Sequence, residues 1–289
     1  MNTITIKDDF DLEKIRTSGQ CFRVKRIDMK DADCPVYSFI YEDSYLEIQE
    51  SNNIKSDKKA KDFNVSCSIE EWENVWYHYF DLRTNYCNIR QEYKGDNEFT
   101  DVCMDFGKGL RILRQEPWEM LITFIISQRR SMPAIASSVE KLCNTLGSKI
   151  ECKDAVTDNT VEFFKFPTPE QIYNANIKQI SDCGVGYRDV YIKCAAEMVM
   201  SGELNLNAID KYCDAVLFNQ LCRVKGVGTK VANCIMLFGY HRCGRAPVDV
   251  WIDRVIKQDF NGENPFPKYG DVAGIIQQYF FYYKTQTSK

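Results

Sequence analysis

The segment from Leu221 to Ile235 limits the possible folds of this chain more than any other stretch. Apolar residues at helical spacing lead into Lys225-Gly226-Val227-Gly228, where two glycines separated by one residue permit a tight turn that residues with a Cβ resist. A second apolar stripe follows at once, made of Val231, Cys234, Ile235 and Phe238. The segment therefore predicts two helices joined by a very short turn.

This turn predicts a binding site as well as a fold. The first amides of the second helix are free and lie at the positive end of its dipole, an arrangement that binds phosphate. Lys230 is in the first turn of this helix, with Cys234 one turn later on the same side. Further along, Pro247-Val248-Asp249-Val250 brings a carboxylate to the expected start of another helix. Lys230 and Asp249 are therefore the first candidates for chemistry.

Composition narrows the class of protein. The net charge of −4 and pI of about 5.5 argue against a simple electrostatic DNA binder, so any phosphate contacts should be few and made largely by amides. No apolar run is long enough to span a membrane, and the N-terminus has no signal-peptide pattern, so we expect an intracellular protein. The thirteen cysteines are odd in number and have no C-x-x-C spacing, which predicts neither a disulfide framework nor a zinc site.

Two regions differ in periodicity. Residues 1–104 are predicted to be an antiparallel β-rich domain, with strands at 36–41 and 45–48, an exposed loop at 51–62 and a short helix at 69–79. Residues 105–289 are predicted to be mainly helical, including apolar helices at 118–127 and 271–283. The expected fold class is α+β.

Gly226 to Ala232 together with Pro247 to Val250 resembles the helix-hairpin-helix motif and Asp loop of a DNA glycosylase superfamily, and more closely the 8-oxoguanine DNA glycosylases. The resemblance implies a hairpin at about 216–240 and an Asp loop at about 241–251. It also implies a base excision repair enzyme that flips 8-oxoguanine out of duplex DNA, removes it and then nicks the strand by β-elimination. Lys230 would be the nucleophile, and Asp249 would pair with it in a buried site and stabilise charge on the sugar.

The same resemblance assigns a base pocket. Thr17 to Arg23 resembles a family segment in which a glycine carbonyl, here that of Gly19, faces the substrate base. Cys234 and Phe281 would sandwich the ring, and Gln277 would bind its Watson–Crick edge. The oxidised base carries a hydrogen at N7 where guanine has a lone pair, so a buried carbonyl would accept from the first and repel the second.

Other family positions imply DNA contacts. Tyr187 would wedge into the base stack and Arg188 would face the opposite strand. Arg129 stands where the family has an Asn that fills the gap left by the base, and Ala134 stands where an Arg reads the orphaned cytosine, a departure that puts opposite-base discrimination in doubt. The remaining expected contacts to phosphate are made by Gly226, Gly228, Val231 and Trp251.

The resemblance implies no required cofactor and a monomer acting on duplex DNA. The carbonyls of Cys222, Val224 and Val227 form a candidate backbone site for a structural cation. The four-cysteine iron–sulfur loop of some relatives has no counterpart after Cys243. Two alternatives stay open: a glycosylase of the same fold for another damaged base, and a helix-hairpin-helix DNA-binding module without catalysis.

Overall fold

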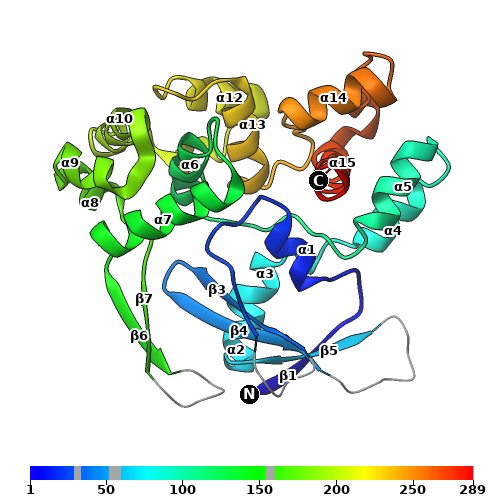
Figure 1. Ribbon diagram of the computed structural model, residues 1–289, viewed down its shortest axis with the longest axis horizontal. Coiled ribbons are helices and arrows are strands. Elements are labelled where there is room, and N and C mark those ends of the chain that lie inside the picture. Colours follow the sequence, from blue (N-terminus) through cyan, green and yellow to red (C-terminus); the bar gives the residue numbers. More distant parts are fainter. Residues whose placement is uncertain (29–33, 52–59, 154–159, 289) are drawn as a thin grey trace.

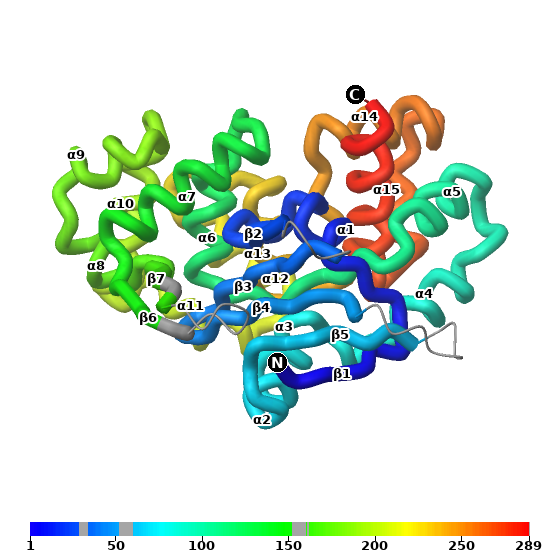
Figure 2. The backbone as a smooth tube through the Cα atoms, turned by 60° about the horizontal axis from the view of Figure 1, so that its bottom comes forward, coloured from blue at the N-terminus to red at the C-terminus, as the bar shows by residue number. Residues whose placement is uncertain are grey.

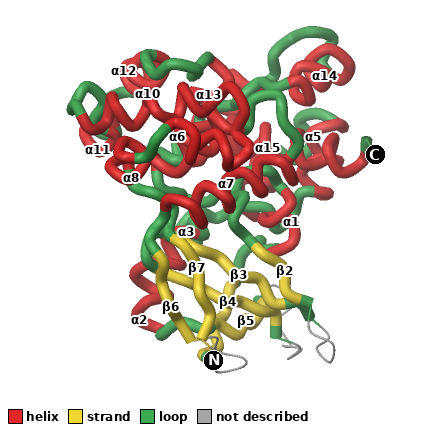
Figure 3. Tube along the Cα trace, turned by 60° about the vertical axis from the view of Figure 1, so that its left-hand side comes forward, coloured by secondary structure: helices red, strands yellow, loops and turns green. Residues whose placement is uncertain are grey.

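A computed structural model describes residues 1–28, 34–51, 60–153 and 160–288. An antiparallel sheet lies at one end of the molecule and the helices gather at the other (Figures 1 and 3). Across the sheet the strands follow the order β1–β5–β4–β3–β2, most of which can be followed in Figure 2. The strands are β1 (Asn2–Ile6), β2 (Lys25–Ile27), β3 (Val36–Tyr41), β4 (Ser44–Glu50) and β5 (Lys61–Val65). The strands predicted at 36–41 and 45–48 are confirmed as β3 and β4.

One face of the sheet is covered by an aromatic helix. Ser68 caps it by accepting a hydrogen bond from the Glu71 amide, and the helix runs through α2 (Ile69–Glu71), a π turn η1 (Trp72–Trp76) and α3 (Tyr77–Tyr79), as predicted. The Tyr79 ring packs edge-on against Phe39 of β3, and the Trp72 and Trp76 rings lie tilted against Phe80. Of the predicted loop at 51–62, residues 52–59 lie outside the described residues, and Lys61 already belongs to β5.

The remaining chain is mainly helical, so the predicted α+β architecture is confirmed. The helices are α1 (Leu12–Thr17), α4 (Tyr86–Glu92), α5 (Glu98–Phe106), α6 (Pro117–Ile126), α7 (Met132–Leu146), α8 (Pro169–Asn174), α9 (Ile177–Ile180), α10 (Asp189–Met200), α11 (Leu206–Ile209), α12 (Asp214–Cys222), α13 (Thr229–Phe238), α14 (Val250–Asp259) and α15 (Ala273–Thr287). Short π and 3₁₀ turns are η2 (Ser181–Val185), η3 (Gly186–Arg188) and η4 (Phe266–Val272).

A two-stranded ribbon interrupts the helical region, and the sequence analysis did not anticipate it. β6 (Lys149–Lys153) pairs antiparallel with β7 (Thr160–Phe164) and lies beside the main sheet (Figure 3). The Phe163 ring stacks on Tyr45 of β4 with the ring centroids 5.4 Å apart, a favourable distance for an aromatic pair. The ribbon therefore joins the helical region to the sheet.

The helical core reaches back into the N-terminal region. Tyr86 and Cys103 are fully buried in it, and Phe99 of α5 packs edge-on against Phe280 of α15. Arg111 is also fully buried and ties the two regions together by donating to the carboxylate of Asp8 and to the carbonyls of Asp9, Phe80, Asp81 and Thr84. The segment from Arg111 to Leu113 is therefore fixed, and the Gln20 side chain next to Gly19 is hydrogen-bonded to it.

Two further features concern the described part of the chain. None of its helices is long and apolar enough to cross a membrane. Its cysteines are free thiols, and among its residues no group of three or more His, Cys, Asp or Glu side chains could hold a metal ion.

Candidate active site

The two predicted helices at the hairpin are α12 and α13, and the turn between them is tight. The Val227 amide donates to the Val224 carbonyl at 2.9 Å, and Gly226 has φ +88°. A Cβ at Gly226 would lie 2.4 Å from Cδ2 of Tyr191, so only glycine fits against this ring. Gly228 caps α13 without a side chain and is exposed. The first amides of α13 are therefore open to a ligand, as a phosphate site requires.

Lys230 lies at a small cavity beside this helix start. Its side chain is half-buried, and its Nζ is 5.5 Å from the centroid of the Phe124 ring of α6. The cavity has a volume of about 50 Å³. Its lining consists of Ser18, Gly19, Phe124, Lys230, Cys234, Phe238, Pro247, Asp249, Gln277, Gln278 and Phe281. Six predicted site residues, far apart in the sequence, thus meet at one place.

Asp249 is held by the helix that it begins. Its Oδ1 accepts hydrogen bonds from the amides of Trp251 at 3.0 Å and Ile252 at 2.9 Å, which caps α14. The loop before it is fixed by a 3.3 Å contact of His241 Nε2 with the Asp81 carboxylate and by a 2.7 Å hydrogen bond from the Gly274 amide to the Cys243 carbonyl. Among the ion pairs of the described residues none joins Asp249 to Lys230. The two groups line one cavity and the carboxylate also caps α14, so their pairing during the reaction stays a prediction.

The Gly19 turn is supported on several sides. Gly19 has φ +75°, and the buried Gln20 side chain donates to the Arg111 carbonyl and accepts from the Leu113 amide. Gln278 of α15 donates to the Ser18 carbonyl at 2.6 Å. No hydrogen bond among the described residues ends on the Gly19 carbonyl. This acceptor is consequently free for a ligand while its backbone is fixed.

The other pocket residues provide an apolar slot with one polar wall. Cys234 is buried, and burial raises the pKa of its thiol, partly opposed by Lys230, so it is a neutral packing surface. Phe281 is half-buried at the same cavity. Gln277 is 4% exposed, and its Oε1 has no hydrogen-bond partner among the described residues. A buried amide oxygen without a partner costs free energy, which a ligand with a matching donor would recover.

The residues expected to contact DNA differ in how exposed their side chains are. Tyr187 is 54% exposed and packs edge-on against Tyr191. Arg129 is exposed, in a loop where it adopts φ +52°. Trp251 is half-buried at the start of α14, with the Arg254 guanidinium 5.1 Å from its ring centroid. These three side chains are placed where a ligand can reach them.

Arg188 differs from expectation. It is 5% exposed, it donates to the carbonyls of Val185 and Gln128, and its guanidinium lies 4.4 Å from the centroid of the Tyr187 ring. Burial excludes water from the guanidinium, so these carbonyls take the place of water as hydrogen-bond acceptors. In this structure Arg188 supports the Tyr187 turn, and its expected contact with the opposite strand stays a prediction.

The candidate cation carbonyls occupy the hairpin turn. The Val224 carbonyl already accepts from the Val227 amide and keeps one lone pair. The backbone cation site at Cys222, Val224 and Val227 stays a prediction.

Comparison with known proteins can now be set beside this geometry. The family model described as the 8-oxoguanine DNA glycosylase N-terminal domain matches residues 3–121. The model of the HhH-GPD superfamily of base excision DNA repair proteins matches residues 122–278, more than half of the chain. The chain belongs to this superfamily. The resemblance stated from the Gly226–Ala232 and Pro247–Val250 motifs is confirmed.

Individual relatives of this HhH-GPD protein agree with the family match. A protein of Methanothermobacter thermautotrophicus named probable N-glycosylase/DNA lyase is 28% identical over 94% of this chain and 93% of its own length. An N-glycosylase/DNA lyase of Saccharomyces cerevisiae is 34% identical over 53% of this chain, which covers 42% of the yeast protein. The structure of the Clostridium acetobutylicum 8-oxoguanine glycosylase/lyase, in complex with duplex DNA containing cytosine opposite 8-oxoguanine, superposes with a TM-score of 0.83 at 29% identity, covering 100% of this chain and 99% of that one.

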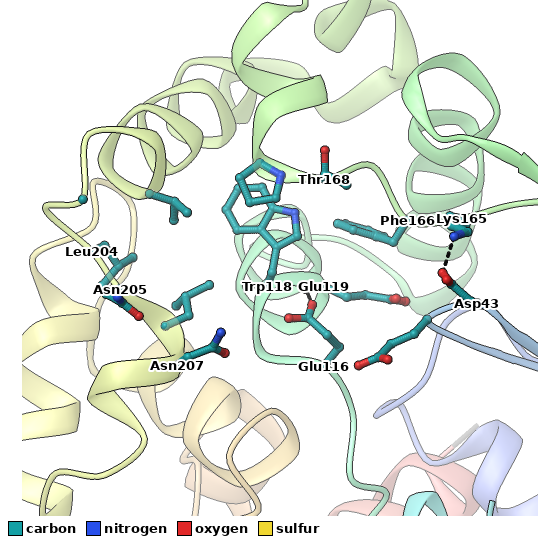
Figure 4. A pocket seen from close by; sticks show the side chains of 15 residues that line it. Asp43, Glu116, Trp118, Glu119, Lys165, Phe166, Thr168, Leu204, Asn205 and Asn207 are labelled. Carbon is teal, nitrogen blue, oxygen red and sulfur yellow. Dashed lines mark hydrogen bonds and ion pairs between the residues drawn. The ribbon is translucent and has the colours of Figure 1, made fainter. Parts of the chain in front are cut away.

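A larger cavity of about 500 Å³ lies at the other end of α6 and does not contain Lys230 (Figure 4). Trp118 and the carboxylates of Asp43, Glu116 and Glu119 line it, and Lys165 pairs with Asp43. This excess of carboxylates repels phosphate. Volume alone would select this cavity, but its carboxylates do not suit a nucleic acid, so the smaller cavity is the candidate active site.

Glu119 makes the free energy of unfolding of this protein depend on pH. Burial raises the pKa of Glu119 to about 7, with Arg23, 3.8 Å away, opposing only in part. The pKa of glutamate in an unfolded chain is about 4.3, so between this pH and pH 7 the folded protein binds a proton that the unfolded chain does not. The contribution of Glu119 to the free energy of unfolding is fully present below the pKa of the unfolded chain and is lost as the pH rises through the folded pKa of about 7. We expect the unfolding free energy to fall by about 1–3 kcal/mol over this window.

Glu119→Gln should remove that part of the pH dependence, because the amide does not titrate. Denaturant unfolding between pH 5 and pH 8 checks this, with Glu170→Gln at an exposed position as the matched control. An unchanged slope in Glu119→Gln would contradict the assignment.

Several residues of the site had no signal in the sequence. Phe124 reads as one more apolar residue of a core helix, and Gln278 as one more polar residue beside the expected Gln277. Met132 has no motif at all, although its Sδ lies against Gly19. Only the fold, which brings α6 and α15 to one cavity and the start of α7 next to Gly19, identifies them.

Proposed function

We propose that this protein removes 8-oxoguanine from duplex DNA with Lys230 as the nucleophile and then cleaves the strand as an AP lyase. The observation that carries the proposal is the meeting of Lys230, Asp249 and the free Gly19 carbonyl at one cavity, beside the open amides of α13. Membership of a base excision repair superfamily and relatives named N-glycosylase/DNA lyase support both activities.

The chemistry follows from the groups at the cavity. The unprotonated Lys230 amine donates its electron pair to C1′ of the everted nucleotide, and the bond from C1′ to the base breaks, with its electrons leaving on the base. The departing base takes up a proton, and the sugar ring opens to a Schiff base. Loss of a C2′ proton then expels the 3′ phosphate by β-elimination. Asp249 stabilises the positive charge that develops on the sugar, because its carboxylate is held beside the cavity by its hydrogen bonds to the first amides of α14.

Base selection rests on hydrogen-bond matching. The Gly19 carbonyl accepts from N7–H of the oxidised base and opposes the lone pair of guanine. Gln277 brings a buried, unpartnered oxygen to the Watson–Crick edge, and Cys234 and Phe281 provide apolar surfaces for the ring faces. The discrimination therefore depends on two fixed acceptors in a dry slot.

The grip on DNA is mostly neutral. The amides at the start of α13, the exposed Tyr187 and the exposed Arg129 are the groups that we propose contact the duplex. With a net charge of −4, few counterions are released on binding, so we expect a shallow salt dependence. The reaction needs no cofactor because a side chain is the nucleophile, and the hairpin carbonyls would hold at most a structural cation. We propose an intracellular monomer acting on nucleoid or nuclear DNA.

Borohydride trapping across a set of lesion duplexes tests this function. The wild type should form a covalent adduct with duplex containing 8-oxoguanine and release that base faster than any other. Preference for a different lesion, such as 3-methyladenine, would favour a same-fold glycosylase for another base. Binding without any adduct or base release would favour a non-catalytic DNA-binding module.

The alanine at position 134 predicts weak opposite-base preference. Ala134 is half-buried at α7 and has no group that could read an orphaned cytosine, and its carbonyl accepts from Arg130 at 3.2 Å. We expect excision opposite cytosine and opposite adenine to differ by less than about fivefold, whereas one good base contact discriminates by about 1–3 kcal/mol. Ala134→Arg should strengthen the preference for cytosine, with Ala134→Met as a control of similar length. A strong preference in the wild type would refute this prediction.

A further inference from the structure

The cavity at Lys230 is too small for the base that it is proposed to receive. Its volume is about 50 Å³, whereas pockets for small molecules typically measure about 300–1,000 Å³. The backbone around it is fixed by the buried hydrogen bonds of Gln20 and Gln278. Entry of a purine therefore requires side chains to move, and the question is which ones.

Met132 and Phe281 fill the space next to Gly19. A Cβ placed on Gly19 would lie 3.1 Å from Met132 Sδ and 3.2 Å from Phe281 Cε1. Both side chains thus press on the same side of the residue whose carbonyl is to read the base. Neither is fully buried, and methionine is flexible, with a thioether that packs well on aromatic rings. These two residues are called the pocket gate below.

Met132 belongs to a segment that contacts the other DNA-facing elements. In the loop 127–131 before it, Gln128 donates to the Gly226 carbonyl of the hairpin at 3.0 Å and accepts, through its own carbonyl, from Arg188. Arg130 donates to the Gly184 carbonyl of the turn that carries Tyr187. Arg129 is exposed in the middle of this loop and has a positive φ, a backbone conformation that residues other than glycine rarely adopt. A shift of the loop on DNA is therefore passed directly to Met132.

We propose that Met132 is a specificity-determining positioning residue, which holds Phe281 against Gly19 until duplex DNA engages the loop 127–131. This inference rests on the proposed function and adds a gate to it. Opening the gate costs free energy for any base. An 8-oxoguanine matched to Gly19 and Gln277 binds strongly enough to fill the pocket despite this cost, whereas guanine does not, so the gate lowers the single-turnover release of guanine alone. Gln128 and Arg130 connect the gate to the hairpin and to the Tyr187 turn.

Shortening Met132 tests the gate. Met132→Ala should bind free 8-oxoguanine base, measured as inhibition of the reaction on a lesion duplex, about tenfold more tightly than the wild type, because the gate no longer needs to be displaced. The ratio of 8-oxoguanine release to guanine release in single turnover should fall about tenfold or more. Met132→Leu keeps the bulk and should behave like the wild type. Affinity for a duplex with an abasic analogue, which places no base in the pocket, should be equal in all three.

The outcomes separate the gate from other roles. If Met132→Ala binds the free base more weakly and releases 8-oxoguanine more slowly, Met132 is a wall of the pocket and the gate is refuted. If both quantities match the wild type, Met132 has no role in selection, and the gate is again refuted. A wild type that excises no base from any lesion duplex would instead refute the proposed function, and the gate with it.

Discussion

Lys230→Gln is expected to abolish base release and borohydride trapping while binding to lesion duplex stays within about tenfold of the wild type. Loss of a nucleophile typically costs about 10⁴-fold or more in rate. Glutamine keeps the length and polarity of the side chain but has no electron pair that attacks C1′. The fold should persist, because Lys230 makes no ion pair within the described residues and its side chain lies at the cavity beside the Phe124 ring and the Cys234 thiol. Single-turnover base release and fluorescence anisotropy measure the two effects.

Lys225 provides the matched control for this variant. It lies in the same hairpin turn, is exposed, and has its Nζ 5.9 Å from the centroid of the Tyr191 ring. Lys225→Gln should weaken DNA binding slightly and leave the trapped adduct intact. Retained turnover in Lys230→Gln, or equal loss in both variants, would show that the nucleophile is another group.

Asp249→Asn is expected to slow base release by about 10²–10³-fold without measurable loss of stability. The charge that offsets the developing cation disappears, and removing one such electrostatic contribution typically costs this much. Asparagine caps helices as well as aspartate, so α14 should keep its bonds to the amides of Trp251 and Ile252. Asp249→Ala should lose about 1 kcal/mol of stability in addition, because the cap is gone.

Asp253 offers the control for charge at the same helix. It pairs with Lys257 one turn later on the exposed side of α14, away from the cavity. Asp253→Asn should leave the rate of base release unchanged. If Asp249→Asn releases the base at the wild-type rate, or if its loss of rate equals its loss of fold measured by circular dichroism, Asp249 is only a helix cap.

Local patterns predicted the elements that position the site. The glycine pair at 226 and 228 predicted the hairpin, because its backbone conformation excludes most other residues. The β-branched and aromatic residues at 36–41 predicted β3, which is buried on both faces over Val36–Ile40. The resemblance then brought Gly19, Lys230, Asp249 and Gln277 to one pocket, and the structure places all four at the same cavity.

What the sequence missed depends on contacts between distant segments. The burial of Arg188 follows from a carbonyl sixty residues earlier, that of Gln128. The missing ion pair between Lys230 and Asp249 follows from how the Asp loop is held by His241 and Gly274. The ribbon of β6 and β7 is short and charged, so its pairing is stabilised by a stack on Tyr45 and not by its own pattern. No local periodicity carries such information.

The most direct test is to identify the residue that becomes linked to DNA. Wild-type protein is reduced with borohydride on a duplex containing 8-oxoguanine, digested, and the DNA-linked peptide is sequenced by mass spectrometry. The account predicts a single modified peptide with the sugar remnant on Nζ of Lys230. A remnant on any other amine, or base release with no covalent adduct at all, would contradict it.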